Sequence, residues 1–188
     1  MINMINTLQD TCWQILEQKG LGGLTAEVVA QNSDISLSDV LEACPTDSDF
    51  LKLLWTDVQS RMPPLPDGLE AHDTLFESTM CLLDALSGKE QAISNLLNDL
   101  PLYPCWVYTI DTVLTPWSHQ VFEKAGFETH GPIYYAKRTV YKGFIGFTLK
   151  TWCHDKTPDK AATMAYVDET LTVLKDTLHK IPMPINLW

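Results

Sequence analysis

Apolar side chains recur every three or four positions along most of the 188-residue chain, and no segment alternates strictly between apolar and polar residues. The most regular series is Met164, Val167, Leu171, Leu174, Leu178 and Ile181, spaced at 3, 4, 3, 4 and 3 residues. Such spacing gathers side chains on one side of a helix, whereas a half-buried strand needs a period of two. The sequence therefore predicts an all-α protein with about nine helices.

The first 62 residues predict a compact unit of four helices. The apolar positions within Ile5–Leu16 indicate a first helix. Thr25 and Ser36 each precede a short apolar-periodic segment, where their hydroxyls are placed to cap a helix. Asp47 is expected to cap a fourth helix, which stops at Pro63-Pro64. Residues 63–188 are expected to form a second domain, a helical bundle for ligand binding and dimerisation.

Charge is distributed unevenly along the chain. Overall, 13 Lys and Arg stand against 24 Asp and Glu, a net charge of −11. Residues 1–100 hold four of the bases and 16 of the acids, 4 − 16 = −12. A DNA-binding surface concentrates Lys and Arg because phosphate neutralisation supplies most non-specific affinity. The N-terminal half is therefore expected to repel DNA.

Motifs that carry catalytic or metal chemistry are absent from the sequence. It contains no G-x-x-x-x-G-K-[ST], H-E-x-x-H, G-x-S-x-G or Glu-x-x-His pair. We therefore expect no enzyme activity, no cofactor and no metal. The five cysteines are scattered without a C-x-x-C pair, and neither a leader nor a membrane-spanning run is evident. These features predict a bacterial cytoplasmic protein with at most a peripheral contact to the inner membrane.

Large apolar and aromatic residues are concentrated between residues 106 and 152. The segment 134–152 is apolar on almost every side, which predicts a helix buried at the centre of a bundle. Its side chains, with those before it, either line a hydrophobic ligand cavity or simply fill the core, and the sequence leaves both readings open. The candidate ligand-binding residues are Trp106, Tyr108, Trp117, Phe122, Tyr141, Phe144, Ile145, Phe147, Thr148 and Trp152.

The N-terminal layout resembles the helix-turn-helix module of TetR-type regulators. The residues that carry the resemblance are Lys19-Gly20, Leu24-Thr25 to Ala30, Ile35-Ser36-Leu37-Ser38 and Pro45 to Leu51. In that family the second short helix reads the major groove of DNA and basic side chains contact phosphates. Between Lys19 and Lys52 this chain has six acids and no Lys or Arg. The module therefore resembles the family in layout and lacks its DNA chemistry.

The C-terminal half resembles the Coq-nine family of ubiquinone-biosynthesis proteins. Its pattern is roughly W-Y-T-[KR]-R followed by a Tyr, a Thr, D-x-S-x-D and T-W-x-F-L. The matching residues are Tyr134 to Arg138, Tyr141, Thr148, Trp152, Asp155, Thr157-Pro158-Asp159, Thr163 and Tyr166-Val167. The resemblance implies a TetR-like fold that holds an isoprenoid lipid and assists a hydroxylase without catalysis. A ligand-responsive TetR-type regulator is the alternative.

Two further surfaces follow from these patterns. The resemblance assigns partner binding to Tyr134, Tyr135, Lys137 and Arg138, although the two basic residues also fit a phosphate or carboxylate head group, or a merely solvated patch. The regular C-terminal series suits a homodimer interface through Val167, Leu171, Leu174 and Leu178. Packing within one chain explains the same spacing, so both interpretations stand.

Overall fold

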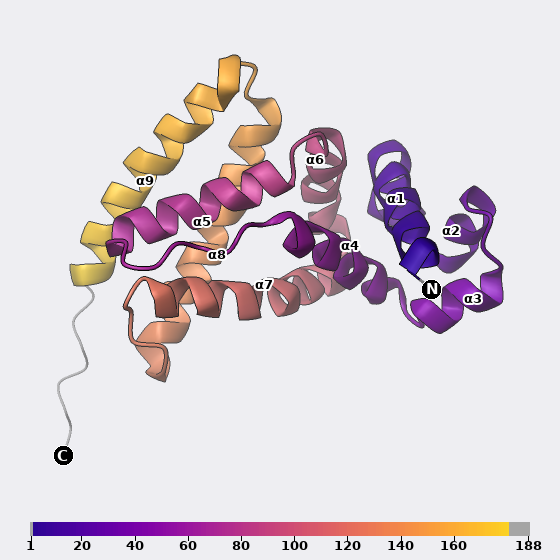
Figure 1. The fold of residues 1–188 in the computed structure, drawn as a ribbon, viewed down its shortest axis with the longest axis horizontal. Helices are drawn as coiled ribbons and strands as arrows, with labels where there is room; N and C mark the ends of the chain where they lie inside the picture. The colour runs from indigo at the N-terminus through magenta and orange to yellow at the C-terminus, as the bar shows by residue number, and fades with distance from the viewer. Residues whose placement is uncertain (1, 181–188) are drawn as a thin grey trace. The chain divides into compact units, whose positions relative to one another are not determined.

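Helices are the regular secondary structure of the residues that the structure describes. This structure is a computed structural model and describes residues 2–180, with side chains from 4 to 174. Within residues 2–180 no strand forms (Figure 1). The α-helices are α1 (Ile2–Lys19), α2 (Ala26–Asn32), α3 (Leu37–Ala43), α4 (Asp47–Arg61), α5 (Ala71–Ala85), α6 (Glu90–Asp99), α7 (Pro104–Lys124), α8 (Gly131–His154) and α9 (Ala161–Lys180). The predicted all-α class is confirmed.

The chain divides into two compact units, each built from two separate segments. The first unit combines Met1–Met62 with Ala85–Val113. The second combines Pro63–Asp84 with Leu114–Trp188, of which the structure describes residues up to 180. The expected division into residues 1–62 and 63–188 is therefore not the division of the structure. The reason is that α6 packs on α1 and so joins the N-terminal unit.

Side chains of α6 complete the C-terminal end of α1. The Asn95 amide donates to the carbonyls of Leu16 and Glu17, at 3.1 and 2.7 Å, in the last turn of α1, where the Leu16 carbonyl also accepts from the Gly20 N–H at 3.1 Å. The Asp99 carboxylate accepts from the backbone N–H of Leu21 at 2.7 Å. Gly20 has a φ of +69°, a conformation that favours glycine, and a Cβ there would overlap the Asp99 carboxylate. These contacts fix the turn between α1 and α2.

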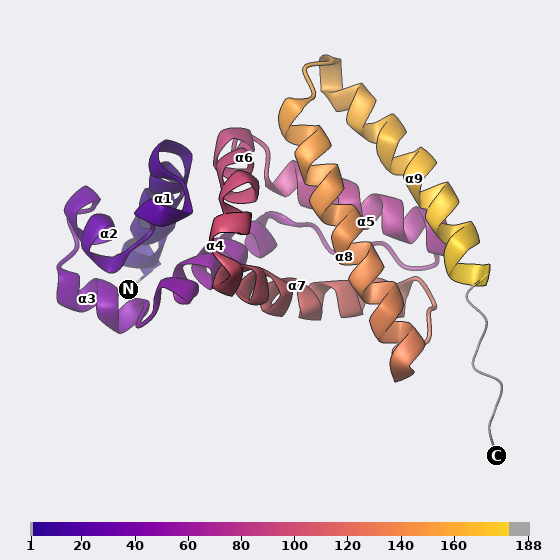
Figure 2. The same cartoon turned by 180° about the vertical axis from the view of Figure 1, so that it is seen from behind.

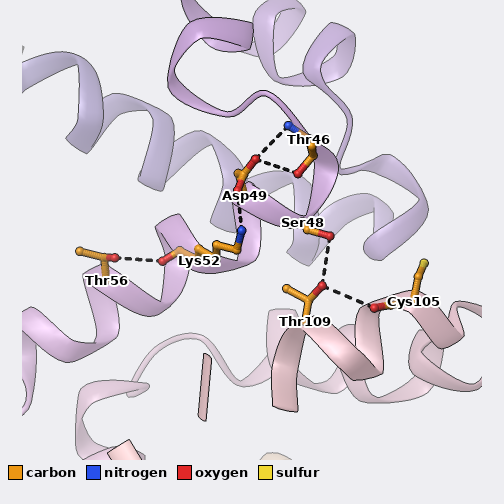
Figure 3. Close-up of polar contacts among 7 residues, drawn as sticks. All are labelled: Thr46, Ser48, Asp49, Lys52, Thr56, Cys105 and Thr109. Atoms are coloured by element: carbon orange, nitrogen blue, oxygen red, sulfur yellow. Dashed lines mark hydrogen bonds and ion pairs between the residues drawn. The ribbon is translucent and has the colours of Figure 1, made fainter. Parts of the chain in front are cut away.

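Local capping explains where the short helices of the first unit begin. Thr25 and Ser36 are the N-caps of α2 and α3, and their side chains accept from backbone N–H groups three residues later. The expected cap of α4 was off by one residue, because the N-cap is Thr46 and Asp47 is the first helical residue. The Asp49 carboxylate accepts from both the N–H and the hydroxyl of Thr46 (Figure 3).

The second unit is organised around α8. Helices α8 and α9 run in opposite directions, joined by a short connection, as both views show (Figures 1 and 2). In that connection the Asp155 carboxylate accepts from the N–H and hydroxyl of Thr157, at 2.8 and 2.6 Å, and from the same groups of Thr163, also at 2.8 and 2.6 Å. These bonds hold the pKa of Asp155 well below its usual range. One carboxylate thus ties the end of α8 to the start of α9.

Helix α8 is buried on one side only, contrary to the expectation of a central helix. Its buried side includes Tyr141, Ile145 and Trp152. Its opposite side exposes Tyr135 to 57 %, Val140 to 46 % and Phe147 to 67 %. The helix is apolar almost all round because it carries two different apolar surfaces, of which only one faces the core.

Candidate functional site

Four of the predicted ligand-binding aromatics pack against one another inside the second unit. The ring of Tyr141 lies 6.0 Å from that of Trp117, 5.5 Å from that of Phe122 and 5.9 Å from that of Phe144, measured between centroids. All four side chains are buried. These centroid separations are typical of aromatic pairs that pack in protein cores. This arrangement favours the core interpretation for these four residues.

The buried hydroxyl of Tyr141 has partners on α5. Its Oη lies 2.9 Å from Ser78 Oγ and 3.4 Å from Thr79 Oγ1, while both of those hydroxyls donate to the Leu75 carbonyl. Burial raises the pKa of Tyr141 to about 12. The phenol is therefore neutral near pH 7 and acts as a polar anchor between α8 and α5.

Thr148, two turns further along α8, is buried without a partner for its hydroxyl. Its side chain is fully buried, and no described group lies within hydrogen-bonding distance of Oγ1. A buried hydroxyl without a partner destabilises a folded protein by about 1–3 kcal/mol. Thr148 is thus the one predicted ligand-binding residue whose polar atom is left available inside the second unit.

The remaining predicted ligand-binding residues differ in the unit to which they belong and in their burial. Trp106 and Tyr108 belong to the first unit, where Tyr108 is 76 % exposed. In the second unit Ile145 and Trp152 are buried, whereas Phe147 projects outward from α8. Of the candidates on α8, Tyr141, Phe144, Ile145, Thr148 and Trp152 are buried and Phe147 is exposed, so they fall on two sides of the helix.

The predicted partner-binding residues do come together, around Arg138. The Arg138 guanidinium carbon lies 5.2 Å from the Tyr134 ring centroid and 5.4 Å from that of Tyr135. Its Nη1 donates to Tyr134 Oη at 3.2 Å, and Tyr134 Oη lies 2.6 Å from His119 Nδ1. We call His119, Tyr134, Tyr135 and Arg138 the Arg138 cluster. Tyr134 is buried within it, so only Tyr135 presents a freely exposed ring.

The Arg138 cluster carries positive charge without a counter-ion in the described chain. No carboxylate of residues 4–174 pairs with Arg138, and its Nε is buried without a hydrogen-bond partner. Lys137 stands over the Phe127 ring at 5.5 Å. Helix α8 contains Lys137, Arg138, Lys142 and Lys150, and its sequence has no acid. The cluster is therefore suited to binding an anion.

His119 was not anticipated by sequence reasoning. It lies on α7, 15 residues before Tyr134, and only packing brings its ring to a centroid separation of 5.7 Å from that of Tyr134. A single histidine in an aromatic-rich segment has no spacing that predicts such a contact. Tertiary structure alone reveals it.

The C-terminal series packs within the chain. Val167 and Leu171 are buried inside the second unit, and Leu174 is half-buried. Leu178 lies in the last turns of α9, beyond the described side chains, and Ile181 lies outside the described residues. Of the two interpretations of the series, intramolecular packing is the one that Val167 and Leu171 satisfy.

The first unit offers polar contacts that are structural. Asp49 of α4 pairs with Lys52 at 2.8 Å, and Thr109 of α7 donates to Ser48 at 3.0 Å (Figure 3). Burial raises the pKa of the Cys12 thiol to about 12 and that of Cys44 to about 11. Both thiols are protonated near pH 7 and are therefore poor nucleophiles.

Comparisons with known proteins leave the chain without an assigned family. It matches no protein-family model, and no curated protein is recognisably similar to it in sequence. The resemblances to the TetR-type and Coq-nine families therefore stay predictions. Across residues 2–180, no helix has the length and apolar content needed to cross a bilayer, and no group of three or more His, Cys, Asp or Glu residues is arranged to hold a metal ion.

Proposed function

We propose that this protein is a non-catalytic accessory of ubiquinone biosynthesis that binds an isoprenoid-type lipid and presents it to a modifying enzyme. The observation that carries the proposal is the exposed apolar residues of α8, Tyr135, Val140 and Phe147, of which Tyr135 lies against Arg138. Exposed apolar side chains gathered on one helix mark an interaction surface. Tyr and Arg are the residue types that contribute most to binding energy at such surfaces.

The lipid is proposed to bind in the second unit. Thr148 supports this assignment, because its buried hydroxyl lacks a partner that a quinone or head-group oxygen would supply. An apolar chain gains roughly 25 cal/mol for each Å² that it removes from water. The lipid tail thus supplies the affinity, and the hydroxyl orients the polar end.

Solvent extraction of the purified protein tests the lipid proposal. The protein is purified without detergent and extracted with organic solvent, and the extract is analysed by mass spectrometry. A stoichiometric quinone or isoprenoid is the expected result. An extract without any lipid contradicts the proposal and leaves the aromatic residues as core.

Docking of the enzyme is tested separately on α8. Tyr135→Ala is expected to weaken binding to a ubiquinone-biosynthesis hydroxylase by at least about tenfold, because the ring is exposed and stacked on Arg138. Lys150→Ala is the matched control, an exposed residue of the same helix. Biolayer interferometry measures both, and equal effects of the two variants contradict the docking surface.

A ligand-responsive DNA-binding regulator is the second candidate. The capped short helices α2 and α3, which pack together, favour it. The stretch from Gly20 to Leu51 opposes it, since it contains six acids and no Lys or Arg. A gel-shift assay at low salt with random-sequence duplex DNA separates the two, because a regulator shifts DNA even non-specifically and an acidic unit does not.

We also propose a homodimer, formed through exposed residues of α8 and not through the buried apolar residues of α9. The exposed apolar positions of α8, Ala136, Val140, Gly143 and Phe147, follow one another at spacings of 4, 3 and 4. Exposed residues of α9 include Asp168 and Glu169, opposite in charge to α8. A second copy that packs its α9 against α8 would bring these opposite charges together, and sedimentation velocity measures the oligomeric state.

A further inference from the structure

The Arg138 guanidinium has an unused hydrogen-bonding edge. Only Nη1 donates a hydrogen bond in the described chain, to Tyr134 Oη at 3.2 Å. The Nε–H is buried and has no partner. Nε and Nη2 together form the planar fork that matches two oxygens of a phosphate or carboxylate. The edge of the guanidinium that recognises oxyanions is therefore the edge left without an acceptor.

The guanidinium is also held in place before any ligand binds. It lies beside the rings of Tyr134 and Tyr135, at 5.2 and 5.4 Å from their centroids, while the two centroids are 5.3 Å apart. Tyr134 Oη accepts from Arg138 Nη1 at 3.2 Å and lies 2.6 Å from His119 Nδ1, so hydrogen bonds from two sides hold the phenol that orients the guanidinium. An arginine ordered by its neighbours loses less entropy on binding than a solvated one.

The electrostatics of α8 add to the same preference. Arg138 and Lys137 lie in the second turn of the helix, whose first turn has no acid and whose N-cap, His130, makes no side-chain capping bond. Lys142, one turn further along, donates to Thr115 at 3.3 Å. A bound anion would relieve this concentration of positive charge.

Nearby acids do not fill the role of counter-ion. Glu128 lies 3.0 Å from His130 Nε2. Glu123, exposed on α7, forms no ion pair with Arg138. Among residues 4–174, therefore, no carboxylate of α8, of α7 or of the connection between them forms an ion pair with the Arg138 guanidinium.

We propose that the Arg138 cluster is an oxyanion site that takes a phosphate group, with Arg138 as the bidentate donor, Tyr134 as its positioning residue and Lys137 as a nearby charge. The phosphate comes from either a soluble phosphate ester or a lipid headgroup, which share this chemistry. The inference concerns an anion bound at Arg138 and does not depend on a lipid bound in the second unit.

Titration with inorganic pyrophosphate in low-salt, phosphate-free buffer tests the site. The ¹⁵N–¹H resonance of Arg138 Nε is expected to shift downfield on saturation, because that group gains an acceptor. Calorimetry is expected to give an affinity at least about tenfold weaker for Arg138→Gln than for the unaltered protein. Lys150→Gln is the matched control, with the same loss of charge on an exposed part of α8, and is expected to bind normally.

Two further variants keep the test decisive. Arg138→Lys keeps the charge but loses the fork, so it is expected to bind as weakly as Arg138→Gln even where the glutamine variant folds poorly. Tyr134→Phe removes the hydroxyl that holds Nη1 and is expected to weaken binding several-fold with an unchanged circular dichroism spectrum. Full binding by Arg138→Lys, or equal losses in Arg138→Gln and Lys150→Gln, overturns the proposal.

Vesicles distinguish the two sources of phosphate. Flotation compares phosphatidic acid vesicles with neutral phosphatidylcholine vesicles, for the unaltered protein and Arg138→Gln. Binding to phosphatidic acid that requires Arg138 assigns the site to a lipid headgroup, and pyrophosphate binding alone assigns it to a soluble ester. Absence of both at millimolar pyrophosphate overturns the proposal, whatever lipid the extraction finds.

Discussion

The buried hydroxyl of Thr148 gives a prediction whose sign is opposite to that of most core substitutions. Thr148→Val replaces the hydroxyl by a methyl group of nearly the same shape, at a site that is fully buried. Because Oγ1 has no partner, the substitution removes a penalty of about 1–3 kcal/mol and loses no hydrogen bond. The free energy of unfolding of lipid-free protein is therefore expected to rise by that amount.

Urea denaturation of protein freed of lipid on a hydrophobic resin measures the change. Thr79→Val is the matched control, because the Thr79 hydroxyl is equally buried but donates to the Leu75 carbonyl at 2.7 Å. That variant is expected to lose about 0.5–1.5 kcal/mol. If Thr148→Val also lowers the free energy of unfolding, the Thr148 hydroxyl has a hydrogen-bond partner within the folded chain. Thr148 then no longer supports the proposed lipid site.

Three further substitutions test the turn after α1, the connection between α8 and α9, and the exposed side of α8. Gly20→Ala is expected to destabilise the protein by at least about 1 kcal/mol in urea denaturation, more than Gly126→Ala, because both have positive φ but only at Gly20 does a Cβ meet another side chain. Asp155→Asn is expected to lower the urea midpoint at pH 7. Since the folded pKa of Asp155 is depressed, its contribution is present above the unfolded value of about 3.9 and is lost as pH falls through the folded pKa, so the difference between variant and parent narrows below about pH 4. A difference that is constant from pH 7 to pH 3 contradicts this. Phe147→Ser is expected to change the free energy of unfolding by no more than about 0.5 kcal/mol while reducing binding of a hydrophobic dye, and a large loss of stability shows instead that the ring packs in the core.

Local sequence patterns were sufficient to predict helices and several of their ends. Thr25 and Ser36 are caps because a hydroxyl three residues before a backbone N–H is a local device. The cap of α4 was missed by one residue, since both Thr46 and Asp47 are residue types that cap helices. Helix caps depend on a few neighbouring residues and can therefore be predicted from the sequence.

The surfaces of α8 and the division into units were not predictable in the same way. Phe144 and Phe147 are the same residue type one turn apart, yet only the first is buried. Which of them faces the core depends on where α5, α7 and α9 lie. The pairing of His119 with Tyr134, and of Asp99 with the turn after α1, likewise join residues that the sequence does not connect by any period.

The discontinuity of the first unit bears on the order in which the chain can fold during synthesis. Asn95 and Asp99, which complete the end of α1, leave the ribosome well after residues 1–62 have emerged. Until then the Glu17 carbonyl and the Leu21 N–H lack these partners, while Pro63–Asp84 is synthesised. A fragment that stops at Met62 is expected to be protease-sensitive, and a ribosome-bound chain should gain protection only once α6 is outside the exit tunnel.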